Sequence, residues 1–378
     1  MIKQQVANAF INSYGQAPVM VFSPGRLNII GEHTDYNEGF VFPAAIDKGI
    51  YAAFGPSDSE LCKVTALDMK ESYAFSLNKI APLEHGGWRN YILGVIKGIL
   101  DAGKQLAPFN LVFGGDIPEG AGLSSSAALE NAVVFGLNEL FKLELSKEEM
   151  IFISQKAEHS FVGVKCGIMD QFASMFGQKN TALLLDCRTI SAKAFHIDLQ
   201  EYQILLINTN VKHSLSDSAY NKRRAVCEKT ASLLDVKALR DVNTSQLSAI
   251  REQVTDEEYQ MARYVIQENE RTQKAGIAMK ANDIAELGQL IYASHNGLQH
   301  QYKVSCEELD FLVDLAKLNP NIAGSRMMGG GFGGCTINII KKDAVRNYAE
   351  KTAAAYLEKF KKNCSVYQVS LSQGTQLI

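Results

Sequence analysis

The spacing of apolar and polar positions alternates between helical and strand patterns, which predicts a protein of mixed α and β structure. Apolar positions recur at helical spacing over residues 1–16, 88–103, 129–141, 147–161, 256–319 and 342–361. Apolar runs of strand length occupy residues 19–22, 109–113, 181–186, 202–208 and 365–371. Residues 44–83 alternate apolar and polar positions between turn signals, which is typical of an antiparallel sheet. We expect the long helical region to break at 281–283 and at 304–306.

The chain is long enough for two hydrophobic cores. Its 378 residues, of which 46% are hydrophobic and 21% charged, are typical of a globular protein with two domains. We place the change of domain near residue 198, between the strands predicted at 181–186 and 202–208. This predicts an N-terminal domain of residues 1–197 and a C-terminal domain of residues 198–378.

The net charge and the cysteine content limit the classes of binding partner and the cellular compartment that we expect. The net charge of −3 gives no electrostatic reason to expect binding to nucleic acid or to an anionic membrane surface. The N-terminus lacks the apolar core of a signal peptide, and no apolar run approaches the roughly 20 residues that span a bilayer. The seven cysteines are scattered without a CxxC pair, which favours reduced thiols over disulfides or a zinc site. We therefore expect a cytoplasmic monomer.

A stretch rich in glycine and serine separates the strand predicted at 109–113 from the next helix. Gly120 and Gly122 let the backbone approach a ligand closely, and three hydroxyls follow from Ser124 to Ser126. A helix N-terminus has unpaired N–H groups and partial positive charge, so it binds anions. The stretch predicts a polyphosphate site with a magnesium ion in reach. An ordinary serine cap is the alternative.

A second polar cluster lies between two strand-like runs near the N-terminus. Arg26, Glu32, His33 and Asp35 fall within ten residues of one another. Carboxylates and an imidazole at close spacing can orient a polyhydroxylated ligand such as a sugar. A metal site has less support because no second His or Cys follows at ligand spacing. The alternative is a purely structural one, a solvated turn with a local ion pair.

Asp170 has apolar neighbours, which predicts a partly buried carboxylate that needs a partner. Arg26 is the natural candidate, since an arginine pairs well with a carboxylate. The alternative is that Asp170 caps the following helix.

Three other features receive structural interpretations. The run from Gly329 to Gly334 contains the pattern GxGxxG. A dinucleotide-binding motif joins a strand to a helix, whereas this run precedes a strand, so we interpret it as a loop that closes on ligands. We interpret Trp88 as core packing rather than as part of a base pocket. We interpret the basic run Lys222–Arg224 as a solvated face.

These motifs resemble those of a known family. The run from Gly25 to Tyr36 resembles the galactokinase signature. The run from Gly120 to Ala127 resembles the phosphate loop of the wider superfamily of galactokinases, homoserine kinases, mevalonate kinases and phosphomevalonate kinases, and the glycine-rich run resembles its third motif. The resemblance implies an α+β two-domain small-molecule kinase fold. Its N-terminal domain would be ribosomal-S5-domain-2-like, its C-terminal domain ferredoxin-like, and the active site would lie in the cleft between them.

The resemblance also implies a role for each candidate site residue. ATP would be the co-substrate, bound by Gly120, Ala121, Gly122, Leu123, Ser124, Ser125 and Ser126. Mg²⁺ would be bound by Ser126 and Glu158, although Glu158 taken alone is more typical of a surface helix charge. D-Galactose would be bound by Glu32, His33, Thr34, Asp35, Gly167, Asp170 and Tyr220. Asp170 would take or orient the proton of the sugar hydroxyl, and Arg26 would stabilise charge on the phosphoryl group.

The implied reaction is transfer of the ATP γ-phosphoryl group to the anomeric C1 hydroxyl of D-galactose, which yields α-D-galactose 1-phosphate and ADP. One alternative is a kinase for a related sugar such as N-acetylgalactosamine, because galactokinase relatives keep the first motif. The other is a non-catalytic galactose and ATP sensor. Such sensors alter the serine and alanine part of the phosphate loop, which is intact here from Ser124 to Ala128.

Overall fold

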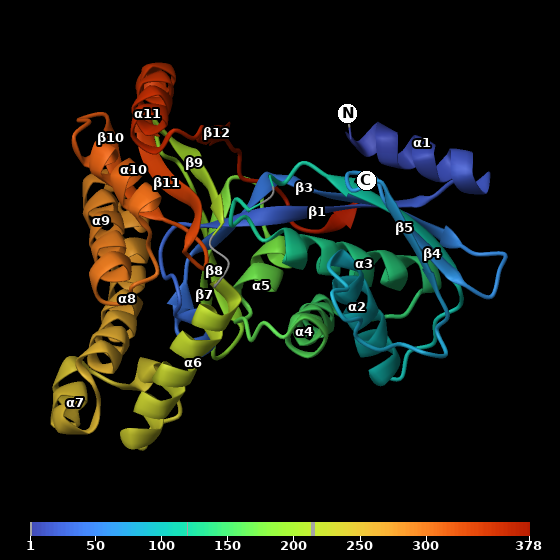
Figure 1. Cartoon of the computed structure of the whole chain (residues 1–378), viewed down its shortest axis with the longest axis horizontal. Helices are drawn as coiled ribbons and strands as arrows, with labels where there is room; N and C mark the ends of the chain where they lie inside the picture. The colour runs from blue at the N-terminus through green and yellow to red at the C-terminus, as the bar shows by residue number, and fades with distance from the viewer. Residues whose placement is uncertain (1, 119, 213–215) are drawn as a thin grey trace.

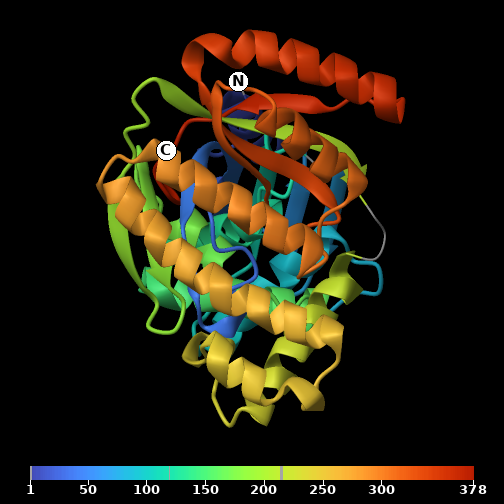
Figure 2. The same cartoon turned by 90° about the vertical axis from the view of Figure 1, so that its left-hand side faces the viewer.

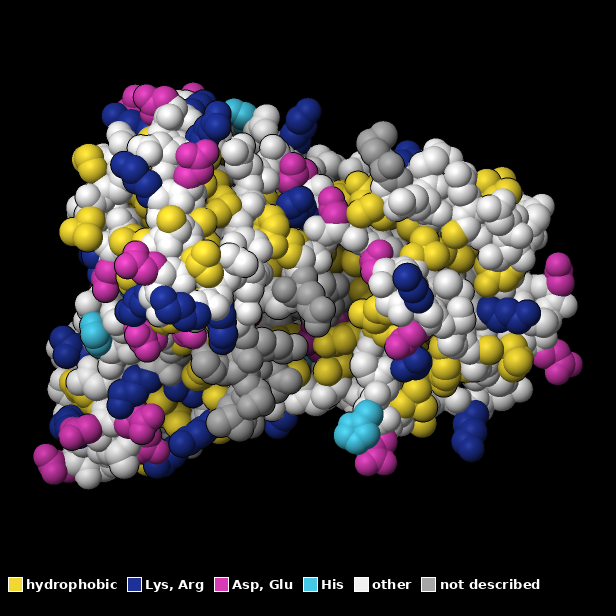
Figure 3. Space-filling view, turned by 45° about the horizontal axis from the view of Figure 1, so that its top comes forward, with side chains coloured by type: hydrophobic (Ala, Val, Ile, Leu, Met, Phe, Trp, Pro, Cys, Tyr) yellow, Lys and Arg dark blue, Asp and Glu magenta, His cyan; other side chains and the backbone are white. Residues whose placement is uncertain are grey.

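The molecule consists of two parts, each built from a sheet covered by helices. The computed structural model describes residues 2–118, 120–212 and 216–378. In Figure 1 the first half of the chain, in blue and green, forms most of the right-hand part, and the second half, in yellow to red, forms the left-hand part. The space-filling view of Figure 3 shows that the surface narrows to a waist between them.

Six strands form the sheet of the first part, in the order β13-β1-β3-β6-β4-β5. Their bounds are β1 (Val19–Asn28), β3 (Pro43–Pro56), β4 (Cys62–Ala66), β5 (Glu71–Phe75), β6 (Phe109–Gly115) and β13 (Gln376–Leu377). The β4–β5 pair is antiparallel, as predicted for residues 44–83. However, β6 lies between β3 and β4 and runs parallel to β4. The local pattern of residues 44–83 carried no information about this insertion, because β6 comes from a later segment.

Helices cover both faces of this sheet (Figure 1). One face carries α2 (Trp88–Asp101), α3 (Ser125–Phe141), α4 (Lys147–Ala157) and α5 (Met169–Phe176), whose buried side chains share one core with the strands. The other face carries α1 (Ile2–Tyr14), which buries Val6 and Phe10 against Ala53 and Val112. Trp88 belongs to the core as predicted, because it is buried edge-to-face against Phe113.

The second part contains a four-stranded antiparallel sheet in the order β10-β11-β9-β12. Its strands are β9 (Tyr202–Lys212), β10 (Ile322–Met327), β11 (Gly333–Lys341) and β12 (Ser365–Gln368). Its helices are α8 (Asp256–Lys280), α9 (Ile284–His300), α10 (Glu307–Lys317) and α11 (Val345–Phe360), with α6 (Ser216–Leu233) and α7 (Thr244–Ala249) at one end. The interruptions between α8, α9 and α10 confirm both predicted breaks. Figure 2 shows α8 and α9 running side by side across this part.

A small sheet joins the two parts. Its strands are β2 (Phe40–Val41), β7 (Thr181–Asp186) and β8 (Ser191–His196), in the order β2-β7-β8. Phe42, just after β2, meets Phe195 of β8 edge-to-face, with ring centroids 5.2 Å apart. The C-terminal end of the chain also returns to the first part, because β13 pairs with β1. The division at residues 197 and 198 therefore stays a prediction.

Candidate active site

The phosphate loop has the backbone that its glycines predict. Gly120 and Gly122 have φ angles of +67° and +69°, in the region that favours glycine. Ser124, the residue before α3, also has a positive φ of 58°, and its side chain makes no cap hydrogen bond. The alternative of an ordinary serine cap therefore does not hold for Ser124. Its hydroxyl donates to Asp170 Oδ2 instead, so the N-terminus of α3 remains open to an anion. Residue 119 of this loop lies outside the described residues.

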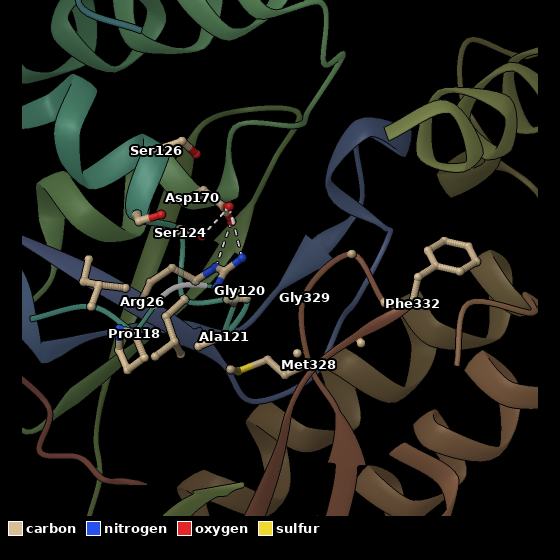
Figure 4. A pocket seen from close by; sticks show the side chains of 18 of the residues that line it. Arg26, Pro118, Gly120, Ala121, Ser124, Ser126, Asp170, Met328, Gly329 and Phe332 are labelled. Carbon is tan, nitrogen blue, oxygen red and sulfur yellow. Dashed lines mark hydrogen bonds and ion pairs between the residues drawn. The ribbon is translucent and has the colours of Figure 1, made fainter. Parts of the chain in front are cut away.

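Arg26 and Asp170 form the predicted pair, shown in Figure 4. Arg26 Nε and Nη2 donate to the two oxygens of Asp170 over 2.8 and 3.0 Å, and Arg26 Nη1 donates to the carbonyl of Gly122 over 2.7 Å. Arg26 is 4% exposed and comes from an irregularity in β1, whereas Asp170 lies in the first turn of α5 and caps no helix. The pair therefore links the phosphate loop to α5 and leaves the Asp170 carboxylate at the edge of a cavity.

Two adjoining cavities meet at this pair. The larger, of about 370 Å³, is lined by the phosphate loop and by the glycine-rich loop after β10. The smaller, of about 140 Å³, is lined by the polar cluster that follows β1. Their shared walls include Arg26, Ser126, Glu158, Asp170 and Tyr220. The residues predicted to bind phosphates and those predicted to bind a sugar thus face neighbouring spaces.

Glu158 lies on the cavity wall and is buried, with 7% exposure. It begins a single π-helical turn (Glu158–Val162) that follows α4, so the interpretation as a surface helix charge is wrong. Ser126, in the first turn of α3, lines the same two cavities. A hydroxyl and a carboxylate are hard oxygen donors that suit Mg²⁺. Among the described residues no three His, Cys, Asp or Glu side chains could hold a metal ion together.

Asp35 and Gly167 approach each other closely at the smaller cavity. A Cβ at position 167 would lie 2.0 Å from Asp35 Oδ2, so only glycine fits there. Burial raises the pKa of Asp35 to about 7, and the negative charge of Asp170 adds to this effect. Gly167 thus lets the carboxyl group of Asp35 sit beside the Arg26–Asp170 pair.

His33 is held in one orientation by aromatic neighbours. It has a positive φ of 63° and is 4% exposed. Its ring centroid lies 5.3 Å from that of Tyr220 and 4.9 Å from that of Tyr302. Burial, followed by the nearby charge of Arg223, lowers the pKa of His33 to about 3, which keeps the imidazole neutral. Its Nε2 atom is buried and makes no hydrogen bond of standard length and angle within the protein, although the backbone of Gly330 lies close to the ring, and the residue lines the smaller cavity.

Glu32 joins the first motif to the glycine-rich loop. Its carboxylate accepts hydrogen bonds from the Gly329 N–H, from Asn28 Nδ2 and from Arg326 Nη2. Arg326 is fully buried, and it also donates to the carbonyls of Asn28, Ile29 and Met327. Glu32 lines the smaller cavity, but much of its hydrogen-bonding capacity is used within the protein.

Thr34 lies deeper than its neighbours. Its hydroxyl is within hydrogen-bonding distance of the carbonyls of Gly31 (2.8 Å) and Phe40 (2.6 Å), and the residue is fully buried. It lines neither cavity described above. A direct contact between Thr34 and a ligand stays a prediction, and the structure shows it closing the loop from Gly31 to Phe40.

The helix α8 supports this same loop with polar residues on its buried side. Glu268 Oε1 accepts the N–H of Gly31 over 3.0 Å, and Asn269 Oδ1 accepts the N–H of Phe40 over 2.9 Å. Tyr264 donates to the carbonyl of Glu32 over 3.0 Å. Our sequence interpretation missed these residues. Polar side chains on the apolar face of a helix were the available signal, since buried polar groups need partners.

Arg223 corrects another interpretation, because it is buried rather than part of a solvated face. It donates to the carbonyls of Tyr302 and Lys303 over 3.0 and 2.6 Å and lies 5.1 Å from the ring centre of Phe332. Its hydrogen bonds therefore anchor α6, which carries Tyr220, to the segment after α9, and its contact with Phe332 links α6 to the glycine-rich loop.

The glycine-rich loop joins two antiparallel strands, β10 and β11, which confirms that it is no dinucleotide motif. Gly329 and Gly331 have φ angles of +83° and +88°. A Cβ at position 331 would lie 2.2 Å from the carbonyl oxygen of Val304, and one at position 329 would lie 3.3 Å from that of Gly122. The loop thus packs tightly between Val304, in the segment that joins α9 to α10, and the phosphate loop.

Three family models match the chain. They are described as the galactokinase galactose-binding signature (residues 8–56), the GHMP kinases N terminal domain (residues 90–178) and the GHMP kinases C terminal (residues 277–358). The first covers the polar cluster after β1, and the second covers the phosphate loop, Glu158 and Asp170.

Full-length relatives and solved structures agree with these matches. The galactokinase of Chloroflexus aurantiacus is 42% identical over 92% of this chain and 90% of its own, and that of Thermotoga neapolitana is 41% identical over 95% and 99%. The crystal structure of Lactococcus lactis galactokinase complexed with galactose matches with a TM-score of 0.95 at 32% identity over the whole of both chains. Methanococcus jannaschii mevalonate kinase, at 16% identity and a TM-score of 0.68, shares the fold. The predicted α+β kinase fold is confirmed, and the chain belongs to the galactokinase family.

Proposed function

We propose that the protein transfers the γ-phosphoryl group of ATP to the anomeric C1 hydroxyl of D-galactose, forming α-D-galactose 1-phosphate and ADP. The observation that carries the proposal is the position of the Arg26–Asp170 pair where the two cavities meet. The relatives named galactokinase and the galactose complex of the Lactococcus lactis protein support the choice of sugar.

Asp170 and Arg26 act on the reacting groups in this proposal. Asp170 accepts the proton of the C1 hydroxyl as that oxygen forms its bond to the γ-phosphorus, or orients the hydroxyl if the transition state is loose. Arg26 lies beside it with a fixed, bidentate geometry and stabilises negative charge on the transferred group. Ser124, which donates to Asp170 Oδ2, keeps that carboxylate in place.

The open N-terminus of α3 and the hydroxyls of Ser125 and Ser126 receive the phosphates of ATP. Gly120 to Leu123 bring the loop backbone close to them. Ser126 and Glu158 would hold Mg²⁺, because both present oxygen ligands to the same cavity. The bound ion would neutralise charge on the β- and γ-phosphates.

The smaller cavity receives the sugar. Asp35 and His33 offer hydrogen-bonding groups there, Tyr220 supplies a wall, and Gly167 provides the space that Asp35 needs. Glu32 presents the remaining carboxylate, already fixed by Arg326. Fixed donors and acceptors of this kind orient a sugar at low entropic cost.

The test is ATP consumption with Mg²⁺ and each of D-galactose, D-glucose, N-acetylgalactosamine and L-arabinose, followed by phosphorus NMR of the product. Turnover with galactose and an anomeric phosphate is the expected result. Turnover with N-acetylgalactosamine in preference would instead identify a related sugar kinase, and binding of galactose and ATP without turnover would identify a sensor.

We also infer that the protein acts as a monomer in the cytoplasm. The seven cysteines are free thiols, which fits a reducing compartment. Within the described residues no helix is both long enough and apolar enough to cross a bilayer. Light scattering after size exclusion tests the monomer, and fractionation of the source cells tests the compartment.

A further inference from the structure

Behind His33, and away from the proposed sugar cavity, lies a row of hydroxyl groups that the proposed mechanism does not use. We propose that Tyr36, Tyr302 and Cys227 form a hydrogen-bond chain that fixes the tautomer of His33 with the proton on Nε2, so that His33 acts as a donor toward the sugar. The two tyrosines are then positioning residues for sugar recognition. The proposal rests on the proposed function only in naming the sugar as the ligand of His33.

The chain of contacts is continuous. The hydroxyl of Tyr36 lies 2.8 Å from His33 Nδ1 and 2.7 Å from the hydroxyl of Tyr302. The hydroxyl of Tyr302 lies 3.4 Å from Cys227 Sγ. Tyr302 and Cys227 are 0% and 1% exposed, so bulk water does not compete for their polar atoms, whereas Tyr36 is partly buried. Each of the three residues comes from a different segment: Tyr36 from the short 3-10 helix Asp35–Asn37, Tyr302 from the segment after α9, and Cys227 from α6.

The direction of the chain follows from the chemistry of its members. A phenol is a better hydrogen-bond donor than a neutral imidazole, and an imidazole nitrogen is a better acceptor than a phenol oxygen. The Tyr36 hydroxyl therefore donates to His33 Nδ1 and accepts from Tyr302. The Tyr302 hydroxyl in turn accepts from the thiol of Cys227. A hydrogen bond to one ring nitrogen decides which nitrogen of a neutral histidine carries the proton.

His33 Nε2 is the free end of the chain. It is buried and makes no hydrogen bond of standard length and angle within the protein, the backbone of Gly330 lies close to the ring, and the residue lines the smaller cavity with Asp35 and Asp170. Those two carboxyl groups offer hydrogen-bond acceptors, and a fixed N–H on His33 adds a hydrogen-bond donor to the wall of the same cavity. A sugar hydroxyl that accepts from His33 can then donate to a carboxylate, which a reversed tautomer would prevent.

The geometry leaves the imidazole ring of His33 little freedom to rotate and exchange its two nitrogens. Its positive φ holds the backbone, and the rings of Tyr220 and Tyr302 flank the imidazole. The low pKa of the ring, caused by burial, removes the doubly protonated form at neutral pH. The Tyr36 hydroxyl at Nδ1 therefore sets which nitrogen carries the proton, and the nearby backbone of Gly330, which favours a protonated ring nitrogen, acts in the same direction.

The direct test is two-bond proton–nitrogen NMR of the ligand-free protein labelled with ¹⁵N-histidine, with the His33 signals assigned by their loss in His33→Gln. We expect protonated Nε2 and unprotonated Nδ1, unchanged from pH 5.5 to pH 8. In Tyr36→Phe the two tautomers should become mixed. Protonated Nδ1, or an equal mixture, in the unaltered protein would overturn the proposal whether or not galactose is phosphorylated.

Steady-state kinetics provides the second test. Tyr36→Phe and Tyr302→Phe should each raise the KM for galactose roughly threefold to tenfold while leaving the KM for ATP within about twofold. Tyr292→Phe is the matched control, since the Tyr292 hydroxyl lies on α9 and has no hydrogen-bond partner. A galactose KM in Tyr302→Phe equal to that of the control, or a raised KM with an unchanged His33 tautomer, would overturn the proposal. Absence of turnover in the unaltered protein would contradict the proposed function alone.

Discussion

Arg326 donates to the carboxylate of Glu32 over 3.1 Å across 294 positions of sequence, and both residues are almost completely buried. Removing one partner would leave the other charge buried and uncompensated, which costs far more free energy than burying the pair together. We therefore expect Arg326→Met to lower the free energy of unfolding by about 3–5 kcal/mol in urea denaturation. Arg346→Met, which removes an exposed ion pair with Glu350, should change it by less than about 1 kcal/mol. Equal effects of the two variants would contradict the importance of the buried pair.

Asp35 should make stability depend on pH. Its pKa rises from 3.8 to about 7 on folding, chiefly through burial. The folded state therefore binds more protons than the unfolded chain between these values, and this contribution to the free energy of unfolding falls as pH rises toward 7. Asp35→Asn should gain stability relative to the unaltered protein from pH 5 to pH 8 in urea titrations. A constant difference between the two proteins over this range would contradict the raised pKa.

Asn269 should affect the sugar more than the nucleotide, because it holds the N–H of Phe40 at the end of the loop that carries His33 and Asp35. Asn269→Ala leaves that buried N–H unpaired, which costs about 1–3 kcal/mol. We expect a lower free energy of unfolding and a several-fold higher KM for galactose, with the KM for ATP unchanged. Glu270→Ala, on the exposed side of α8, is the control. The hypothesis fails if the KM for ATP rises in step with that for galactose.

Glu158 should determine the magnesium requirement. Glu158→Gln keeps the shape of the side chain but weakens it as a ligand for a hard cation. We expect the Mg²⁺ concentration for half-maximal activity to rise at least about tenfold, measured at fixed ATP and galactose. Glu148→Gln, exposed on α4, should leave it unchanged. An unaltered Mg²⁺ dependence in Glu158→Gln would remove Glu158 from the proposed ion site.

Local patterns predicted most helices and strands, the positive φ angles of Gly120 and Gly122 in the loop before α3, and the Arg26–Asp170 pair. Helical spacing and glycine positions depend on neighbouring residues, so a single sequence reveals them. The polar supports were missed because their partners are distant: Arg326 pairs with the first motif, and Asn269 with the loop before β2. We expected Arg223 to be solvated, as residues of a basic run usually are. It is buried instead, because carbonyls just after α9 accept its hydrogen bonds. Glu158 turned inward because α4 ends in a π-helical turn that spacing does not predict.

Phosphorus NMR of the reaction with ATP, Mg²⁺ and D-galactose tests the central claim most directly, run in parallel with the folded Asp170→Asn variant. We expect an anomeric sugar phosphate from the unaltered protein and a rate at least about a hundredfold lower from the variant, because Asn cannot accept the hydroxyl proton. Circular dichroism of the two proteins checks that the variant is folded. No sugar phosphate from the unaltered protein, or near-normal turnover by Asp170→Asn, would contradict the account.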